Sequence, residues 1–189
     1  ATRAHDDAQG VRGSGADVLA AVHGGVRVLN EQEYTTPLPA VLRFVATSKS
    51  AVTADLVARY REVGAAAHPA RTDIEQAASA FLRGWQTGSA QAVIDAAQAG
   101  YAAFLRLAAV LERELVTPEH VAIAAAARRA GGSAKPSGAG GGDLAVVFLP
   151  DEEAAQRLRA ELPAGLRVQS FGLSERGLHV HPGSSEQRT

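Results

Sequence analysis

A short glycine-rich segment, KPSGAGGGD at residues 135–143, contains residue types and a spacing suited to binding an anion. Glycine tolerates positive φ angles and lets a ligand approach the main chain closely. Successive N–H groups in such a turn form a concave site for phosphate. A flexible loop or a tight turn before a strand is the simpler alternative. Because the run is short, non-repetitive and next to an apolar strand, and because it carries Lys135, Ser137 and Asp143, it favours phosphate binding.

The spacing of this segment differs from those of the well-known nucleotide loops. A P-loop places its lysine after the glycines, whereas Lys135 precedes them here. A dinucleotide-binding fingerprint opens a helix early in a βαβ unit, and the segment after residue 143 does not fit that pattern.

Asp17 is the strongest candidate for a reacting carboxylate. It follows a Gly-Ser-Gly turn and falls in the first turn of an expected helix, where the helix dipole favours the ionised form. Phosphoryl transfer depends mainly on positioning and charge stabilisation, so a weak base is sufficient. The spacing Ser14-x-x-Asp17 is also that of a capping box, which would make Asp17 purely structural.

Other polar residues are weaker candidates. Ser48, Lys49 and Ser50 could face a phosphate, and Thr53 could either do so or cap a helix. Arg12 either contacts an anion or is a solvated loop residue, and Lys135 either supports the glycine loop or is an exposed strand residue. The six histidines show no metal-ligand spacing, so we predict no metal site built from this chain's residues.

Three segments together resemble the GHMP kinases, a superfamily of small-molecule kinases. The string AKPSGAGGGD, from Ala134 to Asp143, is similar to their third conserved motif, most closely to its phosphomevalonate kinase version, which commonly continues with Cys where this chain has Leu144. The segment AHDDAQGVRGSGADV, residues 4–18, with the following Gly24-Gly25, resembles a second phosphomevalonate kinase pattern. The Ser/Thr-rich segment SKSAVTADLV, residues 48–57, resembles the helix entry of the second domain.

The resemblance covers roughly residues 1 to 180 and implies a function. It implies transfer of the ATP γ-phosphoryl group to 5-phosphomevalonate in isoprenoid precursor synthesis, with Asp17 as the catalytic residue. The residues that it implies for binding substrate or phosphate are Ser14, Gly15, Ser48, Lys49, Ser50, Ser137, Gly138, Ala139, Gly140, Gly141 and Gly142. Mevalonate kinase, another GHMP kinase, and a catalytically silent α+β binding module stay open as alternatives.

The ATP-binding loop of this superfamily, Pro-x-x-x-Gly-Leu-Gly-Ser-Ser-Ala, does not occur in the sequence, and the chain begins with Ala1 and contains no methionine. We therefore expect the C-terminal part of a longer enzyme, inactive by itself. ATP and Mg²⁺ are the implied cofactors, with the Mg²⁺ ligands in the missing N-terminal half. That half and a small-molecule phosphate acceptor are the implied partners.

Composition agrees with a globular domain. The 189 residues can bury a sizeable core, and the net charge of −1 gives no global field for nucleic acid or membrane binding. No apolar run long enough to span a membrane and no signal peptide are visible, so we expect a cytoplasmic protein. The absence of cysteine excludes disulfides and thiol chemistry.

Periodicity predicts an α+β fold. We expect helices beginning near Asp17, Thr53, Thr72 (from a Thr-x-x-Glu capping box) and Thr117, a long helical stripe from Val93 to Leu115, and a helix at 151–162. The expected strands are a pair at 25–30 and 40–46, and further strands at 144–149, 166–171 and 177–181.

The resemblance implies a ferredoxin-like C-terminal domain with an antiparallel sheet. We divide the chain into a remnant of the N-terminal domain at 1–47, the C-terminal domain at 48–182 and a disordered tail at 183–189.

Overall fold

The computed structural model describes residues 15–27, 33–34, 37–169, 171, 174 and 176–178. The chain divides into two compact units, one formed by Ala1–Pro37 with Gly172–Thr189 and the other by Leu38–Phe171. Each unit is described by itself.

The smaller unit contains one described helix and a short hairpin. Helix α2 (Ala16–His23) starts after Gly15, whose φ of 71° is left-handed, and ends at Gly24. Strands β1 (Val26–Arg27) and β2 (Glu33–Tyr34) pair antiparallel. The N–H of Leu178 donates to Ala21 O over 3.0 Å, so the segment 176–178 packs on the end of α2 without forming the predicted strand; residues 179–181 lie outside the described part.

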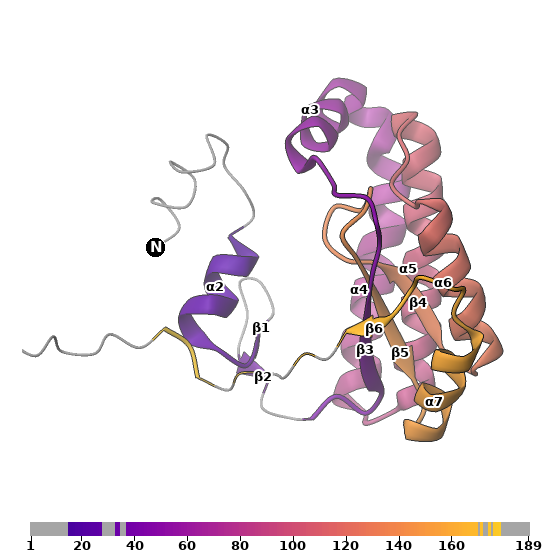
Figure 1. Ribbon diagram of the computed structural model, residues 1–189. Coiled ribbons are helices and arrows are strands. Elements are labelled where there is room, and N and C mark those ends of the chain that lie inside the picture. Colours follow the sequence, from indigo (N-terminus) through magenta and orange to yellow (C-terminus); the bar gives the residue numbers. More distant parts are fainter. Residues whose placement is uncertain are drawn as a thin grey trace, which may run out of the picture. The chain divides into compact units, whose positions relative to one another are not determined.

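The larger unit is built on a four-stranded antiparallel sheet in the order β4-β5-β3-β6 (Figure 1). The strands are β3 (Val41–Ala46), β4 (Ser133–Pro136), β5 (Leu144–Leu149) and β6 (Val168–Gln169). Helix α6 (Pro118–Arg129) precedes β4, and α7 (Glu152–Glu161) connects β5 to β6. This βαββαβ order with the outer strands beside β3 and β5 confirms the predicted ferredoxin-like α+β domain.

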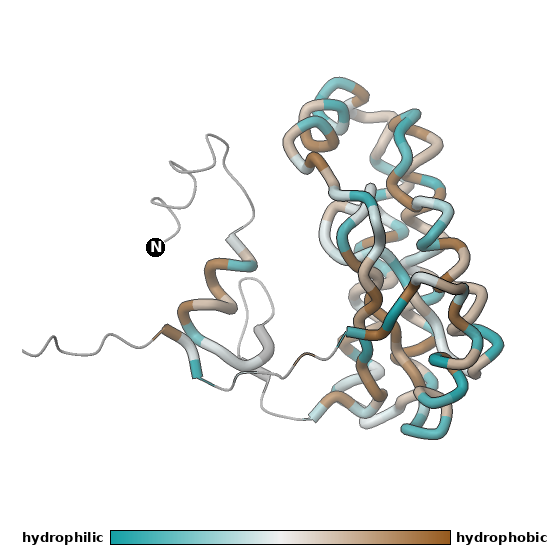
Figure 2. The backbone as a smooth tube through the Cα atoms, viewed as in Figure 1, coloured by the Kyte–Doolittle hydropathy of each residue, from teal (hydrophilic) through white to brown (hydrophobic). Residues whose placement is uncertain are grey.

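Three further helices and a 3₁₀ turn are inserted between β3 and α6: α3 (Thr53–Val63), η1 (Gly64–Ala67), α4 (His68–Gln86) and α5 (Ala90–Leu111). Helices α4 and α5 pack against each other (Figure 1), and α5 also contacts β4 and β5. By length and composition α5 could cross a membrane, but its contacts are those of a core helix. The hydrophilic and apolar stretches that alternate along the helices (Figure 2) fit helices that bury one face.

Strand alternation assigns the two faces of the sheet. Val45, Val147 and their neighbours on one face join the main core with residues of α6 and α7 such as Ile123 and Leu158. On the other face, Ser133 Oγ donates to Ile94 O of α5 over 2.8 Å. Phe148, directly opposite Ser133, meets Phe81 of α4 edge-to-face. Both faces are therefore covered, one by α6 and α7 and the other by the α4–α5 pair.

The predicted helix starts at Thr53, Thr117 and Asp151 are confirmed, and the predicted start at Thr72 is wrong. Thr117 and Asp151 cap α6 and α7 through their side-chain oxygens. Thr72 instead lies inside α4, because Pro69 occupies the first turn, where its fixed φ suits a helix. Thr53 is the first residue of α3, whose N-cap is Val52 without a side-chain hydrogen bond.

The predicted pairing of 25–30 with 40–46 is also wrong. Strand β1 pairs with β2, whereas β3 pairs with β5 from Val41↔Leu149 to Ala46↔Leu144, which aligns two apolar runs. Strand β4 was missed because Ser, Ala, Lys and Pro have low strand propensity, and proline is tolerated on an edge strand. Strand β3 precedes the predicted boundary at residue 48 yet belongs to the sheet of the larger unit.

The turn from α6 to β4 generates a matched pair of substitutions. A Cβ at Gly132 would lie 2.3 Å from Phe148 O and 2.7 Å from Leu149 Cδ2, whereas one at Gly131, with φ of 89°, would meet nothing within 4 Å. We expect Gly131→Ala to lower the free energy of unfolding by about 1 kcal/mol, the cost of the left-handed conformation. Gly132→Ala should lower the free energy of unfolding by about 2–3 kcal/mol or more, because the backbone of Gly132 or of Phe148 must move to make room for the methyl group. Urea unfolding measures the stability of both variants. Equal decreases in the free energy of unfolding would contradict the close contact between the start of β4 and the end of β5.

Candidate functional site

The glycine loop, residues 137–143, is fixed by hydrogen bonds to two other segments. Ser137 N donates to Leu144 O over 2.8 Å and closes the loop. Gly141 N donates to Leu115 O over 2.8 Å, in the connection that follows α5. Asp143 N donates to Lys49 O over 2.7 Å, in the connection that follows β3. Three segments distant in sequence therefore meet at one end of the sheet.

The glycines of this loop serve different purposes. A Cβ at Gly140 would lie 2.5 Å from Leu115 O, and one at Gly142 would lie 2.2 Å from Lys49 O, so both are required by contact with the protein's own backbone. Gly141 has a φ of 83° and ordinary contacts around a Cβ. Gly138 has a φ of 61° with open space beside it. Gly138 is the loop glycine with room for a ligand at its α-carbon.

Asp143 ties the glycine loop to the segment before α3. Its Oδ1 accepts a hydrogen bond from Ser50 Oγ over 2.8 Å, and its Oδ2 accepts from Ala51 N over 3.4 Å. Asp143 is also one of two non-glycine residues with positive φ among the described residues. Its carboxylate is therefore used to join two loops.

Three N–H groups of the glycine loop make no hydrogen bond within the described part of the chain. They belong to exposed Gly138, half-buried Ala139 and buried Gly142, so only the first two are open to a ligand. The loop lies beside the start of α3, since a Cβ at Gly141 would be 3.6 Å from Leu56 Cδ1. The first N–H groups of a helix have no partner within it and carry partial positive charge. Open N–H groups beside a helix start fit a phosphate oxygen.

Charged side chains beside the glycine loop are paired with other groups of the protein. Lys49 Nζ lies 2.5 Å from Glu114 Oε2, with the lysine side chain 55% exposed. Glu119 Oε2 accepts a hydrogen bond from Ser48 N over 2.8 Å. The structure thus brings the predicted residues Ser48, Lys49 and Ser50 to the glycine loop, but through contacts within the protein.

His120 is buried beneath the loop in its neutral form. Its Nδ1 accepts from Thr117 N over 3.2 Å, which leaves Nε2 as the donor to Leu144 O at 3.3 Å. Burial lowers the pKa of His120, against smaller raising effects from the Leu144 carbonyl and from Glu119, Asp143 and Glu114. Protonation would place a second N–H against the donor of Thr117, so the neutral imidazole suits this position.

Lys135 is half-buried and is not the exposed strand residue that the sequence allowed. Its Nζ donates to Pro136 O over 3.0 Å and lies 5.5 Å from the centroid of the Phe104 ring. Burial lowers the pKa of Lys135.

Asp17 and Gly15 belong to the smaller unit. Gly15 is the N-cap of α2 with no side-chain capping hydrogen bond, and exposed Asp17 accepts from Val18 N through Oδ1 over 2.9 Å. Ser14 and Arg12 lie outside the described residues, so their predicted roles stay predictions. The catalytic role predicted for Asp17 likewise stays a prediction.

Several residues around the loop had no signal in the sequence. Thr47 Oγ1 donates to Lys49 O, and the other such residues are Glu114 and Leu115 of the α5–α6 connection and Glu119 and His120 of the first turn of α6. Only the tertiary fold brings this connection to residues 137–143. Among the described residues, no group of three or more His, Asp or Glu side chains could hold a metal ion.

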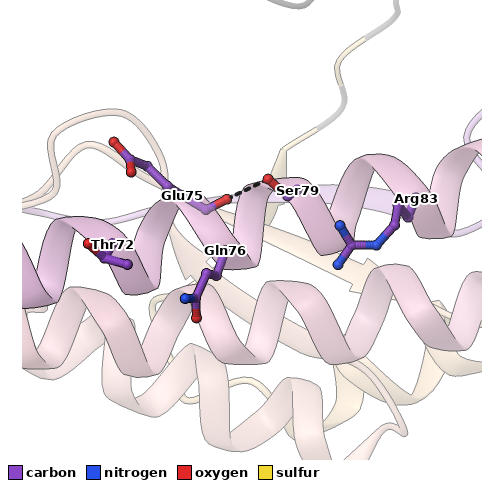
Figure 3. Close-up of a pocket in the computed structure, with 5 residues that line it drawn as sticks. All are labelled: Thr72, Glu75, Gln76, Ser79 and Arg83. Atoms are coloured by element: carbon purple, nitrogen blue, oxygen red, sulfur yellow. Dashed lines mark hydrogen bonds between the residues drawn. The ribbon is translucent and has the colours of Figure 1, made fainter.

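A depression on the surface of α4 lies apart from these segments. It is lined by Thr72, Glu75, Gln76, Ser79 and Arg83, all from one helix, and Ser79 Oγ donates to Glu75 O within it (Figure 3). Glu75 is already paired with Arg71. None of the lining residues belongs to the segments that contact the glycine loop.

The burial of His120 predicts a pH dependence of stability. Unfolded histidine has a pKa of about 6.5, and the folded pKa is lower, so the unfolded state binds more protons between the two values. This contribution to stability is present above about pH 6.5 and is lost as pH falls toward the folded pKa, with a limiting slope of about 1.4 kcal/mol per pH unit. Urea unfolding from pH 8 to pH 5 should show this component in the native protein and lack it in His120→Gln. Parallel curves for the two proteins would contradict it.

Comparison with known proteins places this fold in a family. A search of curated proteins found no match. The family model described as GHMP kinases C terminal matches residues 77–168.

Solved structures share the fold at low sequence identity. The Lin0012 protein from Listeria innocua is 18% identical with a TM-score of 0.73, over 88% of this chain and 59% of that one. Streptococcus pneumoniae phosphomevalonate kinase is 18% identical with a TM-score of 0.57, over 69% of this chain and 39% of that one. Mevalonate kinase from L. major, solved with R-mevalonate, is 21% identical with a TM-score of 0.59, over 82% and 52%. This chain thus corresponds to between 39% and 59% of their lengths. The family match, on the sheet and helices described above, shows that this chain carries a C-terminal domain of the GHMP kinase family.

Proposed function

We propose that this chain is the C-terminal part of a small-molecule kinase that transfers the γ-phosphoryl group of ATP to 5-phosphomevalonate in the cytoplasm. The observation that carries the proposal is the GHMP kinase match over residues 77–168, joined to a glycine loop in which the N–H groups of Gly138 and Ala139 make no hydrogen bond to the described residues. Streptococcus pneumoniae phosphomevalonate kinase, which shares the fold, has been solved with phosphomevalonate and AMPPNP.

The described residues fit a phosphoryl group better than they fit a metal ion. The N–H groups of exposed Gly138 and half-buried Ala139 can donate to phosphate oxygens beside the start of α3. Mg²⁺ prefers several oxygen ligands in octahedral geometry, and no such cluster of side chains occurs in the described part of the chain. We therefore place any Mg²⁺ ligands in an N-terminal half of the enzyme and derive no step through the metal.

Each residue of the proposed site has a defined task. ATP, when bound, supplies the phosphoryl group. The glycine loop holds phosphate oxygens by its N–H groups, which is the positioning that phosphoryl transfer requires. Asp17, in the first turn of α2 in the smaller unit, is assigned the separate task of orienting the acceptor oxygen or taking its proton.

Two alternatives carry different expectations. A mevalonate kinase, or another GHMP kinase, would use the same loop with a different acceptor. The structural similarity to L. major mevalonate kinase supports this alternative. A catalytically silent binding module would bind phosphate ligands without turnover.

The experiment is reconstitution of the kinase. We expect no ATP turnover by residues 1–189 alone and turnover after co-expression with an N-terminal GHMP kinase half, preferring 5-phosphomevalonate over mevalonate. In that assembly Asp17→Asn should lower kcat by about 100-fold or more, the range of a positioned acid–base group. Glu153→Gln, an exposed first-turn acid of α7, is the matched control and should leave kcat unchanged. Equal activity of Asp17→Asn and the control would contradict the catalytic role. Phosphate-ligand binding without turnover would favour the silent module.

Gly138 allows a test of the phosphate cradle that spares the fold. Gly138→Ala and Gly131→Ala both place a Cβ in open space at a positive φ, so each should cost about 1 kcal/mol of stability. Only the methyl group at Gly138 would meet a ligand at the loop, so Gly138→Ala should weaken phosphate-ligand affinity by about tenfold or more. Calorimetric titration with AMPPNP and with 5-phosphomevalonate, beside thermal melting, measures both effects. Identical affinities for the two variants would exclude the loop as the phosphate site.

A further inference from the structure

The use of lysine in this chain is restricted to one place. Of 19 basic residues, 17 are arginine, and the two lysines are Lys49 and Lys135. Lys49 O accepts the hydrogen bond of Asp143 N, and Lys135 lies two residues before Ser137, the first residue of the glycine loop. Both lysines therefore adjoin the glycine loop, although arginine supplies the positive charge everywhere else.

The two lysines differ in how their charge is compensated. Lys49 is exposed and paired with Glu114. Lys135 makes no ion pair with any described residue, and its contacts are the carbonyl of Pro136 and the ring of Phe104. The other residues placed against it are also uncharged: Val146 is its partner on β5, and Gly100 on α5 would bring a Cβ to 3.6 Å from its Cδ.

An ammonium in such surroundings lacks a counter-charge. Removing a cation from water is costly unless it is paired, and burial without an acidic neighbour lowers the pKa of Lys135. An arginine would keep its charge at any ordinary pH but is bulkier and planar, whereas lysine presents a compact charge on a flexible stem. Lysine therefore suits the narrow space between β4 and α5.

We propose that Lys135 is a half-buried cation that supports anion binding at the glycine loop, and that the bound phosphoryl group supplies the negative charge that no described acidic residue places beside it. The inference rests on the proposed function of the loop, and it assigns Lys135 as a positioning and electrostatic residue without direct contact to the reacting atoms. The attraction between a cation and a nearby anion increases as water between them is excluded. Hydrogen bonding of Lys135 Nζ to Pro136 O places the charge where β4 becomes the loop.

Two lysines make a direct measurement possible. Protein labelled only with ¹³C-lysine gives two Cε resonances, which Lys49→Arg assigns. In the free protein Lys135 should titrate below the ordinary lysine pKa of about 10.4. Sulfate is a tetrahedral dianion whose own charge is constant from pH 7 to pH 10. Saturation with sulfate should move the midpoint of the Lys135 titration upward by about one pH unit, which means a higher pKa. AMPPNP and 5-phosphomevalonate form the other arms and show whether the nucleotide or the acceptor supplies the phosphoryl group.

A charge-free variant separates the electrostatic role from a structural one. Lys135→Met keeps the length and the apolar stem but removes the ammonium. We expect about tenfold weaker sulfate binding at pH 7.5, with a melting temperature equal to or above that of the native protein, because a half-buried charge without an acidic partner has been removed. A lysine that only braces Pro136 O predicts the reverse, a lower melting temperature with unchanged affinity, and that result would overturn the proposal.

The amide resonances of the loop distinguish failure of this inference from failure of the proposed function. Sulfate that shifts the ¹⁵N signals of Gly138 and Ala139 but leaves the pKa of Lys135 unchanged would refute the role of Lys135 and leave the phosphate loop intact. No shift at the loop and none at Lys135, up to saturating sulfate, AMPPNP and 5-phosphomevalonate, would refute both.

Discussion

Close contact between main chains at the glycine loop is the constraint on which the candidate site depends. Gly140 presses against Leu115 O, and Gly142 against Lys49 O, at distances that leave no room for a Cβ atom. Hydrogen bonds from Gly141 N and Asp143 N join the same segments. The connections after β3 and after α5 are therefore held against the loop by backbone, and the positions of Ser50, Glu114 and His120 follow from that junction.

The sheet topology explains why this junction forms at the end of β5. Strands β3 and β5 are antiparallel, with Ala46 opposite Leu144, so the segment that leaves β3 and the loop that enters β5 emerge at the same end. Asp143 then joins them through Ser50 Oγ and Ala51 N, which sets the start of α3 beside Gly141. A ferredoxin-like sheet with α3 inserted after its first strand thus places the glycine loop, the segment after β3 and the start of α3 beside one another.

Electrostatic compensation around the cradle is asymmetric. The carboxylates of Glu114, Glu119 and Asp143 each accept a hydrogen bond from a donor of the protein. These hydrogen bonds stabilise the contacts between loops. The ammonium of half-buried Lys135 contacts a carbonyl oxygen and an aromatic ring, and it has no acidic partner among the described residues. A site whose carboxylates are hydrogen-bonded and whose ammonium has no acidic partner is suited to receive an anionic ligand, as the proposed kinase function requires.

The amino-acid sequence by itself determined the helix caps at Thr117 and Asp151, the apolar strands β3 and β5, and the glycine loop, because caps, apolar alternation and glycine runs are local signals. It misplaced the start of α4 at Thr72 and missed β4, since Pro69 and the pairing with β5 outweigh local propensity. Only the tertiary structure decided which glycines face the protein and which faces open space, and that Lys135 is half-buried without an acidic partner among the described residues. Those facts depend on contacts between segments far apart in the chain, which no local pattern encodes.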